Sequence, residues 1–354
     1  MTDLEKLCSR VTEAADCAVI TDDVNRRYFT AMKSSAGTLV VFPEKAYFII
    51  DFRYIEKAKK TVTACEVILQ DKLYEQINSL IEKYGAKTVA VNADTCTLSE
   101  LIAYQQKLNA EVIADTKLAE IIREIRTVKS QEQIDKIIKA QRIAEKGFAH
   151  MLDFIKVGRT EKEIQLELDY YMLKNGAEAL SFDTIALSGS NTSLPHGVPS
   201  DKKVESGEFV LMDFGATYDG WHSDMTRTVC VGKPSDKMKS VYETVLTAQL
   251  TALDAVKAGM SGKALDKIAR DIITEAGYGD NFGHSLGHGV GVEIHESPYA
   301  SPSREDILPE NSIVTVEPGI YLEGKFGVRI EDFVVVTENG CINMTKAPKE
   351  LICL

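Results

Sequence analysis

His284-Ser-Leu-Gly-His288-Gly-Val-Gly-Val-Glu-Ile-His295-Glu296 is the densest run of histidine and glycine in this chain. Three of the six histidines lie in this run, and none precedes His150. Imidazole is the commonest neutral metal ligand, and it titrates closest to physiological pH. Glycines around the histidines would let the backbone take turns that bulkier residues resist, and they occupy Gly283, Gly287, Gly289 and Gly291. We therefore expect a flexible loop that binds a metal ion or performs acid–base chemistry.

Other interpretations of this run fit it less well. The spacing Gly287-x-Gly-x-Gly differs from that of the dinucleotide-binding fingerprint. A zinc-protease helix beginning at His295 would need a second histidine at the position of Tyr299. Pro298 would also break that helix early. A glycine-rich structural turn with incidental histidines stays open until carboxylates elsewhere in the chain are considered.

The composition is that of an ordinary globular protein. The chain has 354 residues, 44% of them hydrophobic and 27% charged, which allows two domains or one large one. The net charge of −12 disfavours nucleic acid or an anionic membrane as the main partner. Seven cysteines without C-x-x-C spacing fit reduced thiols in a cytosol better than a disulfide framework. Because the N-terminus lacks an apolar signal core and no apolar run reaches the roughly 18 residues of a membrane span, we expect a cytoplasmic protein.

Residues 1 to about 125 have the pattern of an α/β unit. Thr38–Phe42 and Tyr47–Ile50 are short apolar runs around a proline-containing turn, which predicts a β-hairpin. Apolar residues recur at helical spacing over Lys72–Tyr84, a glycine follows as a stop signal, and strand character resumes at Thr88–Val91. This part contains no histidine and no glycine-framed pair of carboxylates, so we expect it to carry no chemistry of its own.

A boundary is expected between Ile125 and Ser130, where the pattern changes to long helices. Capping boxes begin at Ser130 and at Thr160, each with Gln or Glu three residues later. The apolar periodicity predicts four helices, which run from Ser130 to about Ile155, from Thr160 to Asn175, from Asp236 to Lys257 and from Lys263 to Ala276.

Strands are predicted between and after these helices. Glu208–Ala216 and Ser223–Val231 flank Asp219-Gly220, the strongest short signal for a two-residue hairpin turn. Ile313–Glu317 and Val328–Val336 predict another strand pair near the C-terminus. The second part of the chain is therefore expected to be α+β with antiparallel strands.

The first of these hairpins carries two aspartates, Asp213 and Asp224. If Asp219-Gly220 is a two-residue loop, Asp213 pairs with Thr226, and Asp224 lies on the same face because it is two residues from Thr226. Two carboxylates on one face of adjacent strands repel each other unless a cation lies between them. A solvated hairpin with this face exposed to water is the alternative that the sequence leaves open.

Two glutamates near the C-terminus border apolar strands. Glu317 ends the run Ile-Val-Thr-Val, and Glu331 lies in Gly-Val-Arg-Ile-Glu-Asp-Phe-Val-Val-Val, where an acid is costly to bury unless it is neutralised. With Asp213, Asp224 and His288 they form a hard, oxygen-rich ligand set that suits Mn²⁺, Co²⁺ or Zn²⁺ in a two-metal site. Two such ions about 3.5–4 Å apart can activate water and polarise a carbonyl group.

These five residues lie in motifs that, in this order, resemble the pita-bread metallopeptidases, specifically the branch of aminopeptidase P and prolidase. The motifs are Met-Asp-Phe-Gly with Asp213, Ser-Asp-Met-Thr-Arg-Thr with Asp224, Gly-His-Gly-Val-Gly with His288, Val-Glu-Pro-Gly with Glu317 and Gly-Val-Arg-Ile-Glu-Asp with Glu331. Each motif alone is a weak signal, whereas five in order are a strong one. The resemblance implies that the five residues bind two divalent metal ions, Mn²⁺ foremost with Co²⁺ or Zn²⁺ as alternatives.

The resemblance covers nearly the whole chain. Residues 1–125, with Asn25-Arg-Arg-Tyr-Phe-Thr and Asp51-Phe-Arg-Tyr, are similar to the creatinase-type N-terminal domain, and residues 126–354 to the pita-bread catalytic domain. The implied fold is an α/β N-terminal domain followed by an α+β catalytic domain with a curved antiparallel sheet. Members of this branch are commonly homodimers, so we expect a homodimer in which the N-terminal domain serves dimerisation and limits access to the cleft.

The same resemblance assigns roles around the metal ligands. His196, in Leu-Pro-His-Gly-Val-Pro, and His295 would face the substrate and hydrogen-bond the oxyanion that develops on the scissile carbonyl. Glu317 would act as general base and then as general acid. His284 and Arg329 would lie behind the metal ligands or at the substrate. The remaining histidines, His150 and His222, match no functional position.

The implied reaction is hydrolysis of the bond between an N-terminal residue and a following proline, a tertiary amide without N–H that general peptidases handle poorly. We expect a Xaa-Pro aminopeptidase, with a Xaa-Pro dipeptidase (prolidase) as the alternative, because the sequence does not show whether the far end of the cleft is blocked. Creatinase works without the metal set and methionine aminopeptidases typically lack the N-terminal domain, so both rank lower. A non-enzymatic binding module on this fold is the alternative outside enzymes, and such relatives usually lose ligands that this chain retains.

Overall fold

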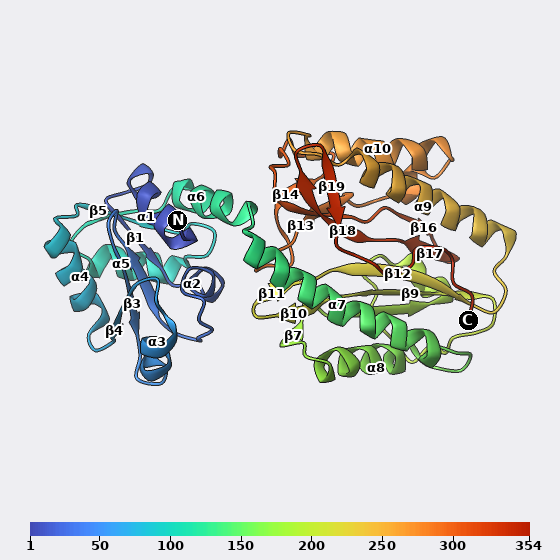
Figure 1. The fold of residues 1–354 in the computed structure, drawn as a ribbon, viewed down its shortest axis with the longest axis horizontal. Coiled ribbons are helices and arrows are strands. Elements are labelled where there is room, and N and C mark those ends of the chain that lie inside the picture. The colour runs from blue at the N-terminus through green and yellow to red at the C-terminus, as the bar shows by residue number, and fades with distance from the viewer. The chain divides into compact units, whose positions relative to one another are not determined.

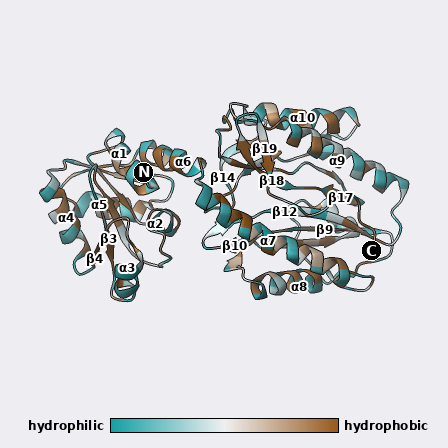
Figure 2. Ribbon diagram, viewed as in Figure 1, coloured by the Kyte–Doolittle hydropathy of each residue, from teal (hydrophilic) through white to brown (hydrophobic).

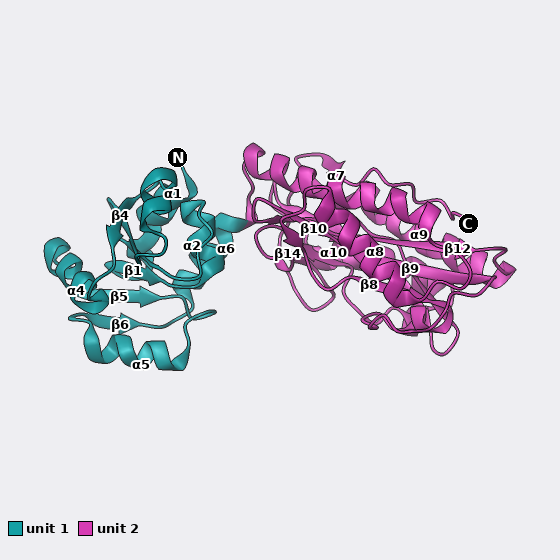
Figure 3. Cartoon of the chain, turned by 90° about the horizontal axis from the view of Figure 1, so that it is seen from below, with its two compact units in different colours: residues 1–126 teal, residues 127–354 magenta.

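Two compact units make up the chain. The computed structural model describes all 354 residues, and they divide into Met1–Arg126 and Thr127–Leu354 (Figures 1 and 3). Each unit has its own buried cores of apolar side chains. None of the helices is both long and apolar enough to cross a membrane.

The first unit is built on one mixed sheet with the spatial order β4-β3-β2-β1-β5-β6. Strands β1, β2 and β3 pair antiparallel, and the outer pairs are parallel. The strands are β1 (Cys17–Ile20), β2 (Thr38–Val41), β3 (Ala46–Ile50), β4 (Glu66–Leu69), β5 (Thr88–Val91) and β6 (Glu111–Ile113). The helices are α1 (Asp3–Arg10), α2 (Asp23–Thr30), α3 (Ile55–Thr61), α4 (Leu73–Tyr84), α5 (Leu98–Lys107) and α6 (Lys117–Thr127), with a 3₁₀ turn at Val11–Glu13.

Side-chain alternation buries both faces of this sheet. On β1, Ala18 and Ile20 belong to a core with α1, α2 and α6, whereas Cys17 and Val19 belong to a core with α4 and α5. Because successive side chains on a strand point to opposite faces, a strand buried on both faces is apolar throughout. Figure 2 shows this as brown strands surrounded by helices that alternate between teal and brown.

The elements expected in this unit are confirmed. Strands β2 and β3 form the hairpin, α4 occupies the predicted helical stretch, and β5 follows it. Gly85 ends α4 with a φ of 63°, a left-handed conformation that glycine adopts without steric cost.

The second unit combines four helices with small antiparallel sheets, so the expected α+β architecture is confirmed. The helices are α7 (Gln131–Phe154), α8 (Glu161–Lys174), α9 (Asp236–Ala255) and α10 (Gly262–Glu275), with 3₁₀ turns η2 (Gly189–Ser193) and η3 (Gly279–Asn281). The strands are β7 (Ala179–Leu180), β8 (Ile185–Ser188), β9 (Glu208–Phe214), β10 (Ala216–Tyr218), β11 (Trp221–His222), β12 (Met225–Val231), β13 (Gly287–Gly289), β14 (Glu296–Ala300), β15 (Ile313–Val316), β16 (Gly319–Leu322), β17 (Phe326–Arg329), β18 (Asp332–Thr337) and β19 (Gly340–Asn343). They form the sheets β11-β10-β7, β12-β9-β8, β13-β14, β15-β18-β19 and β16-β17.

Both predicted capping boxes are present in the structure. The side chains of Ser130 and Thr160 accept hydrogen bonds from the backbone N–H of the third residue of α7 and of α8. The side chain of that third residue in turn accepts a hydrogen bond from the backbone N–H of the capping residue. These caps fix where the two helices begin.

The predicted register of the first hairpin is confirmed. Asp213 on β9 lies opposite Thr226 on β12, and the turn at Asp219-Gly220 has φ values of 49° and 82°, as a two-residue primed turn requires. All residues of β12 are buried. The alternative of a solvated hairpin is therefore wrong.

The expected C-terminal strand Val328–Val336 is in fact two strands in different sheets. β17 ends at Arg329 and pairs with β16, whereas β18 begins at Asp332 and pairs with β15. The break falls at Ile330-Glu331. Apolar periodicity cannot reveal it, because both halves are buried and β-rich.

The histidine-rich run is a loop on either side of a short strand. His288 lies on β13, and none of the four glycines around the histidines has a positive φ. Instead, a Cβ at Gly287 would lie 2.0 Å from the Thr315 carbonyl oxygen, and one at Gly289 would lie 2.4 Å from the Ser297 carbonyl oxygen. These glycines are needed for the close approach of neighbouring strands.

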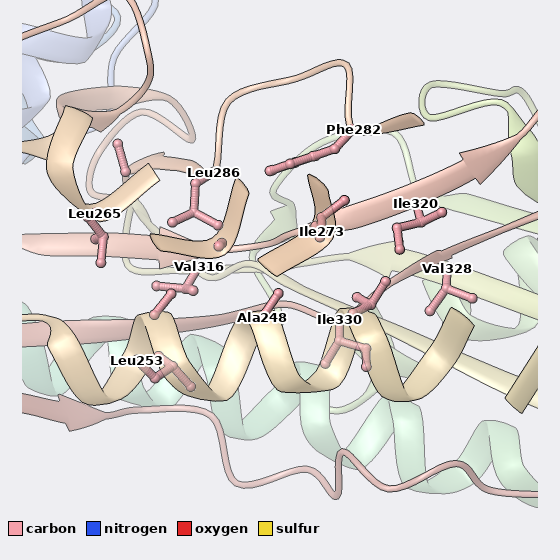
Figure 4. Packing of buried hydrophobic residues seen from close by; sticks show 14 of the residues in the cluster. Ala248, Leu253, Leu265, Ile273, Phe282, Leu286, Val316, Ile320, Val328 and Ile330 are labelled. Carbon is pink, nitrogen blue, oxygen red and sulfur yellow. The ribbon is translucent and has the colours of Figure 1, made fainter. Parts of the chain in front are cut away.

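Two helix pairs cover the sheets of this unit. Helices α7 and α8 pack against β8, β9 and β12, while α9 and α10 pack against β15, β16, β17 and β18. Figure 4 shows the second core, where Ala248 of α9 and Ile273 of α10 lie against Val316 and Ile330. The side chains that alternate with these core residues point away from the covering helices, toward the space between the sheets.

Candidate active site

A cavity of about 790 Å³ in the second unit brings the sequence candidates together. All of the side chains singled out from the sequence line it: Asp213, Asp224, His288, Glu317, Glu331, His196, His284, His295 and Arg329. The segments 182–185 and 195–199, which are apolar or small apart from Asp183 and His196, contribute much of the remaining wall. Its volume is within the range of pockets that bind small molecules.

The positions of the acids on a strand or just beyond one explain why the carboxylates meet here. Asp213 lies between Met212 and Phe214, which belong to the core under α7 and α8. Glu317 and Glu331 directly follow Val316 and Ile330, which belong to the core under α9 and α10. The acids therefore point away from both cores and toward each other.

Three of the candidate ligands form a compact group. One ligand atom each from Asp224, His288 and Glu331 lies within 4.8 Å of the others, and all three residues are buried. Burial and then the neighbouring carboxylates raise the pKa of Asp224 and that of Glu331 well above their ordinary values. A cation between these acids would remove the cause of both shifts.

Glu317 joins this group through His288. Its Oε1 lies 3.2 Å from His288 Nε2 and accepts a hydrogen bond from Thr315 Oγ1 at 3.1 Å. Burial opposes charge on both groups, yet their hydrogen bond and attraction lower the pKa of Glu317 to about 2 and raise the pKa of His288 to about 9. A metal ion bound by His288 would take the place of the proton that His288 carries toward Glu317 in the metal-free protein.

Asp213 stands apart from the compact group because it pairs with Arg329. Arg329 donates to Asp213 Oδ2, to Tyr321 Oη at 2.7 Å, to Thr226 Oγ1 at 3.1 Å and to the Pro195 carbonyl at 3.3 Å. The arginine is 2% exposed, so most of its donors are engaged inside the protein. Burial raises the pKa of Asp213 despite this partner.

The donor set of the cavity fits divalent metal ions. Asp213 Oδ1 and Glu331 Oε1 are buried without a hydrogen-bond partner, which is costly for a carboxylate oxygen. The four carboxylates of the candidate ligand set face the guanidinium of Arg329 and the imidazole of His288, so negative charge is in excess among these groups. Oxygen ligands with one imidazole suit Mn²⁺, Co²⁺ or Zn²⁺, and no cysteine lines the cavity.

The other three histidines of the cavity have different surroundings. His284 is held at both ring nitrogens, 2.8 Å from the Ser285 carbonyl and 2.9 Å from Tyr321 Oη. His295 meets His288 edge to face with ring centres 4.2 Å apart. Burial and then the charge of His288 lower the pKa of His295 to about 4, so its imidazole is neutral at pH 7. His196 is exposed on the loop between β8 and β9.

Hydroxyl groups that the sequence analysis did not single out hold these side chains. Thr226 donates to Glu331 Oε2 at 2.7 Å, Thr315 donates to Glu317, and Tyr321 links Arg329 to His284. Thr226 and Thr315 lie two residues from Asp224 and Glu317, so strand alternation could have found them. Tyr321 gave no sequence signal, because its partners meet only in the fold.

The two histidines without an assigned function lie outside the cavity lining, as expected. His150 Nε2 is 2.6 Å from Glu167 Oε1, and its ring stacks on Tyr171. His222 Nδ1 is 3.3 Å from Thr217 Oγ1.

Comparisons with known families match both units. The family described as metallopeptidase family M24 matches residues 135–338, and the creatinase/prolidase N-terminal domain matches residues 4–128. The Xaa-Pro dipeptidase of Pyrococcus furiosus is 40% identical over 352 residues, which cover 99% of each chain.

Solved structures give the same result. A structure of a Xaa-Pro dipeptidase from Bacillus anthracis matches with a TM-score of 0.96 and 42% identity, over 99% of each chain. A structure of an X-Pro aminopeptidase from Thermotoga maritima matches with a TM-score of 0.91 and 39% identity, over 96% of this chain and 98% of that one.

Proposed function

Because the chain belongs to metallopeptidase family M24 and carries a creatinase/prolidase N-terminal domain, we propose that it is a Xaa-Pro dipeptidase that uses two divalent metal ions. Members of this family are hydrolases that use divalent metal ions. The observation that carries the proposal is the buried group of four carboxylates and His288, with excess negative charge, in a cavity large enough for a short peptide.

The sequence alone placed an aminopeptidase first, and the comparisons favour the dipeptidase. The Pyrococcus furiosus relative and the Bacillus anthracis structure are both named Xaa-Pro dipeptidase and match over the full length of the chain. The Thermotoga maritima structure, which is named an aminopeptidase, is slightly less identical. The substrate that we propose is therefore a dipeptide with proline as its second residue.

The metal ligands in this proposal are Asp213, Asp224, His288, Glu317 and Glu331. When bound, two divalent ions activate water and polarise the scissile carbonyl. Asp213 and Glu331 each offer a carboxylate oxygen without any other partner, and hydrogen bonds from Thr226 and Thr315 orient Glu331 and Glu317. Mn²⁺ is the metal that we propose first, with Co²⁺ and Zn²⁺ as alternatives.

Glu317 is the proton carrier of the proposed reaction. As an ionised carboxylate, it would accept a proton from the attacking water. It would then pass this proton to the proline nitrogen, which must be protonated to leave as an amine. The hydrogen bond from Thr315 Oγ1 fixes the carboxylate during both transfers.

His295 and His196 are the groups that we propose to hold the scissile carbonyl. The low pKa of His295 keeps its imidazole neutral, so the ring has one N–H to donate. Because it carries no positive charge, it does not compete with the metal ions for the carboxylates. A donor aimed at the developing oxyanion stabilises the transition state more than the bound substrate. Arg329 would hold Asp213 and Tyr321 in place, and His284 would hold Tyr321, because the guanidinium and the ring are already hydrogen-bonded to these side chains.

Several further properties belong to the proposal. We assign residues 1–125 to a creatinase-type domain that serves dimerisation and limits access to the cleft, and residues 126–354 to the catalytic domain. We also propose a cytoplasmic homodimer. Light scattering that shows a fully active monomer would contradict the assembly.

A hydrolysis assay with added Mn²⁺ tests the substrate class. It compares Xaa-Pro dipeptides with Xaa-Pro tripeptides and longer peptides of the same N-terminal residue. We expect kcat/KM for the dipeptide to be higher by about tenfold or more, which corresponds to ~1.4 kcal/mol of discrimination. Equal or faster hydrolysis of the longer peptides would identify an aminopeptidase instead, and hydrolysis of neither would exclude both.

A further inference from the structure

A buried carboxylate outside the cavity is hydrogen-bonded to both ends of the loop that carries His196. Glu161 is the first residue of α8 and is fully buried. It faces the residues at the two ends of the segment 188–200, which connects β8 to the approach of β9. Residues 195–199 of this segment line the cavity.

Glu161 accepts hydrogen bonds from both ends of this segment. At the first end, Ser188 N and Ser188 Oγ donate to its Oε1 at 2.7 and 3.2 Å. At the second end, Ser200 N and Ser200 Oγ donate to its Oε2 at 3.0 and 2.6 Å. Asn191 Nδ2 donates to both oxygens at 3.0 and 3.2 Å. A single carboxylate thus accepts from five donor groups of the loop, and the two of Ser188 are fully buried.

The backbone of α8 strengthens the same connection. The first N–H groups of a helix have no partner within the helix. In α8, the N–H groups of Glu161 and Lys162 donate to the carbonyls of Lys202 and Ser200, each at 3.1 Å. The exit of the loop is therefore attached to the helix by main chain and by side chain.

The interior of the loop is attached to the active site itself. Gly327 N on β17 donates to the buried Thr192 Oγ1 at 2.8 Å. Arg329, two residues further on β17, donates to the Pro195 carbonyl at 3.3 Å and also holds Asp213. Between the attachment at Pro195 and that at Ser200 lie four residues, of which His196 and Val198 are exposed and Pro199 is buried.

We propose that Glu161 is a positioning residue, which holds the loop 188–200 so that His196 reaches the substrate. This inference rests on the role of His196 in the proposed function. Glu161 touches neither the substrate cavity nor a metal ligand, so it acts only through the loop. Its five donors all require an acceptor, and a carboxylate is acceptor-only on both oxygens.

The substitution Glu161→Gln tests this role, because it keeps the shape of the side chain and turns one oxygen into an NH₂ group. That NH₂ group would meet the donors of Ser188 or of Ser200, and one end of the loop would be released. We expect kcat to fall by roughly 10- to 100-fold, the effect of moving a substrate-contacting group by about 1 Å, with a smaller change in KM. Glu163→Gln is the matched control, since Glu163 is exposed on the same helical turn and glutamine preserves its capping box.

Two measurements separate positioning from a general loss of structure. Hydrogen exchange should be faster at the amides of 188–200 in Glu161→Gln and unchanged elsewhere and in Glu163→Gln. A double-mutant cycle should show that Glu161→Gln has little further effect on kcat in a His196→Ala background. Ser200→Ala, which removes one donor and keeps the carboxylate, should show the same effects at up to about fivefold in kcat if Glu161→Gln fails to fold.

Each contrary outcome has its own meaning. Unchanged exchange in the loop, or additive effects of Glu161→Gln and His196→Ala, would overturn the positioning role. A normal kcat for His196→Ala would instead overturn the assigned role of His196, and any faster exchange in Glu161→Gln would then be structural only. Absence of Xaa-Pro hydrolysis in the unmodified protein would reject the proposed function, a result that the exchange measurement does not depend on.

Discussion

Two buried ionic clusters of the second unit occupy adjacent positions of the chain and differ in how they are balanced. Arg227 and Asp332 belong to one, and Thr226 and Glu331, each one residue earlier, belong to the other. Arg227, Glu331 and Asp332 are all at most 1% exposed. Their burial is therefore equal, and only the partners of the charges differ.

The cluster of Asp332 is closed. Its Oδ1 accepts from Arg227 Nη2 at 2.7 Å, and its Oδ2 accepts from Asn343 Nδ2 at 2.6 Å and Lys349 Nζ at 2.9 Å. Burial opposes its charge, yet Arg227 and Lys349 lower its pKa below the ordinary value. Every charge in this cluster has a protein partner, as a structural ion pair requires.

The cluster of Glu331 is open. Its Oε1 has no hydrogen-bond partner, and its carboxyl lies among three other acids whose charges, after burial, raise its pKa. A fold stabilised only by its own contacts would not keep such a group. Burial alone therefore does not identify a functional acid, whereas burial without a countercharge does.

The sharpest way to break this comparison is the substitution Glu331→Gln. It should reduce peptidase activity to the detection limit and lower the content of bound metal. In metal-free protein it should leave the free energy of unfolding unchanged or raise it, because a buried acid that has no countercharge of its own and lies among three other acids is replaced by a neutral amide. Denaturant unfolding of the metal-free variants measures this sign, and a clear destabilisation would mean that Glu331 is balanced by the protein itself.

The neighbouring substitution Asp332→Asn should have the opposite effect on stability. It leaves Arg227 buried beside a neutral amide, and breaking a buried ion pair in this way costs about 3–5 kcal/mol of unfolding free energy. Because Asp332 does not line the cavity, the remaining folded protein should keep its affinity for metal. Urea unfolding and metal analysis of one preparation test both statements, and a stability equal to that of the unmodified protein would contradict them.

His288 and His295 allow the comparison to be sharpened within the cavity. His288→Ala should lower metal content together with activity, because His288 belongs to the open cluster. His295→Ala should keep the metal and lower kcat by roughly 10²–10³, the usual effect of losing one oxyanion donor, with a smaller change in KM. Metal analysis of the two purified variants decides, and loss of metal from His295→Ala with retention in His288→Ala would reverse the two roles.

The smallest expected effect belongs to Lys349→Gln, at the rim of the closed cluster. The lysine side chain is 20% exposed and donates to Asp332 Oδ2, which Asn343 also satisfies. Losing one of two donors at the rim should cost about 1 kcal/mol of unfolding free energy. Urea unfolding measures it, and a loss as large as that of Asp332→Asn would show that Lys349, rather than Arg227, balances the cluster.

Local signals in the sequence predicted those parts of the fold that local physics determines. The capping boxes at Ser130 and Thr160 and the turn at Asp219-Gly220 were recognisable because each depends on a few adjacent residues. The break at Ile330-Glu331 was not recognisable, because two buried strands of different sheets have the same composition as one long strand. The glycines around His288 were misinterpreted for a related reason, since close strand approach and flexible turns both require glycine.

The candidate site shows the same division. The motifs pointed to the acids and histidines that the cavity brings together, and strand alternation placed Asp213 opposite Thr226. The contact of Asp213 with Arg329 and the bridge made by Tyr321 could not be predicted, because they depend on how β9, β16 and β17 are placed in space. Glu161 escaped for the same reason, since its partners Ser188 and Ser200 are far from it in the sequence.

In the proposed enzyme, two divalent cations balance the open cluster, and the protein is active only when they are bound. Metal-free protein titrated with Mn²⁺ while hydrolysis of a Xaa-Pro dipeptide is followed tests it most directly. We expect no activity without metal, a rise of activity as Mn²⁺ is added and a plateau at two equivalents per chain, with Glu331→Gln inactive throughout. Full activity in verified metal-free protein would contradict it.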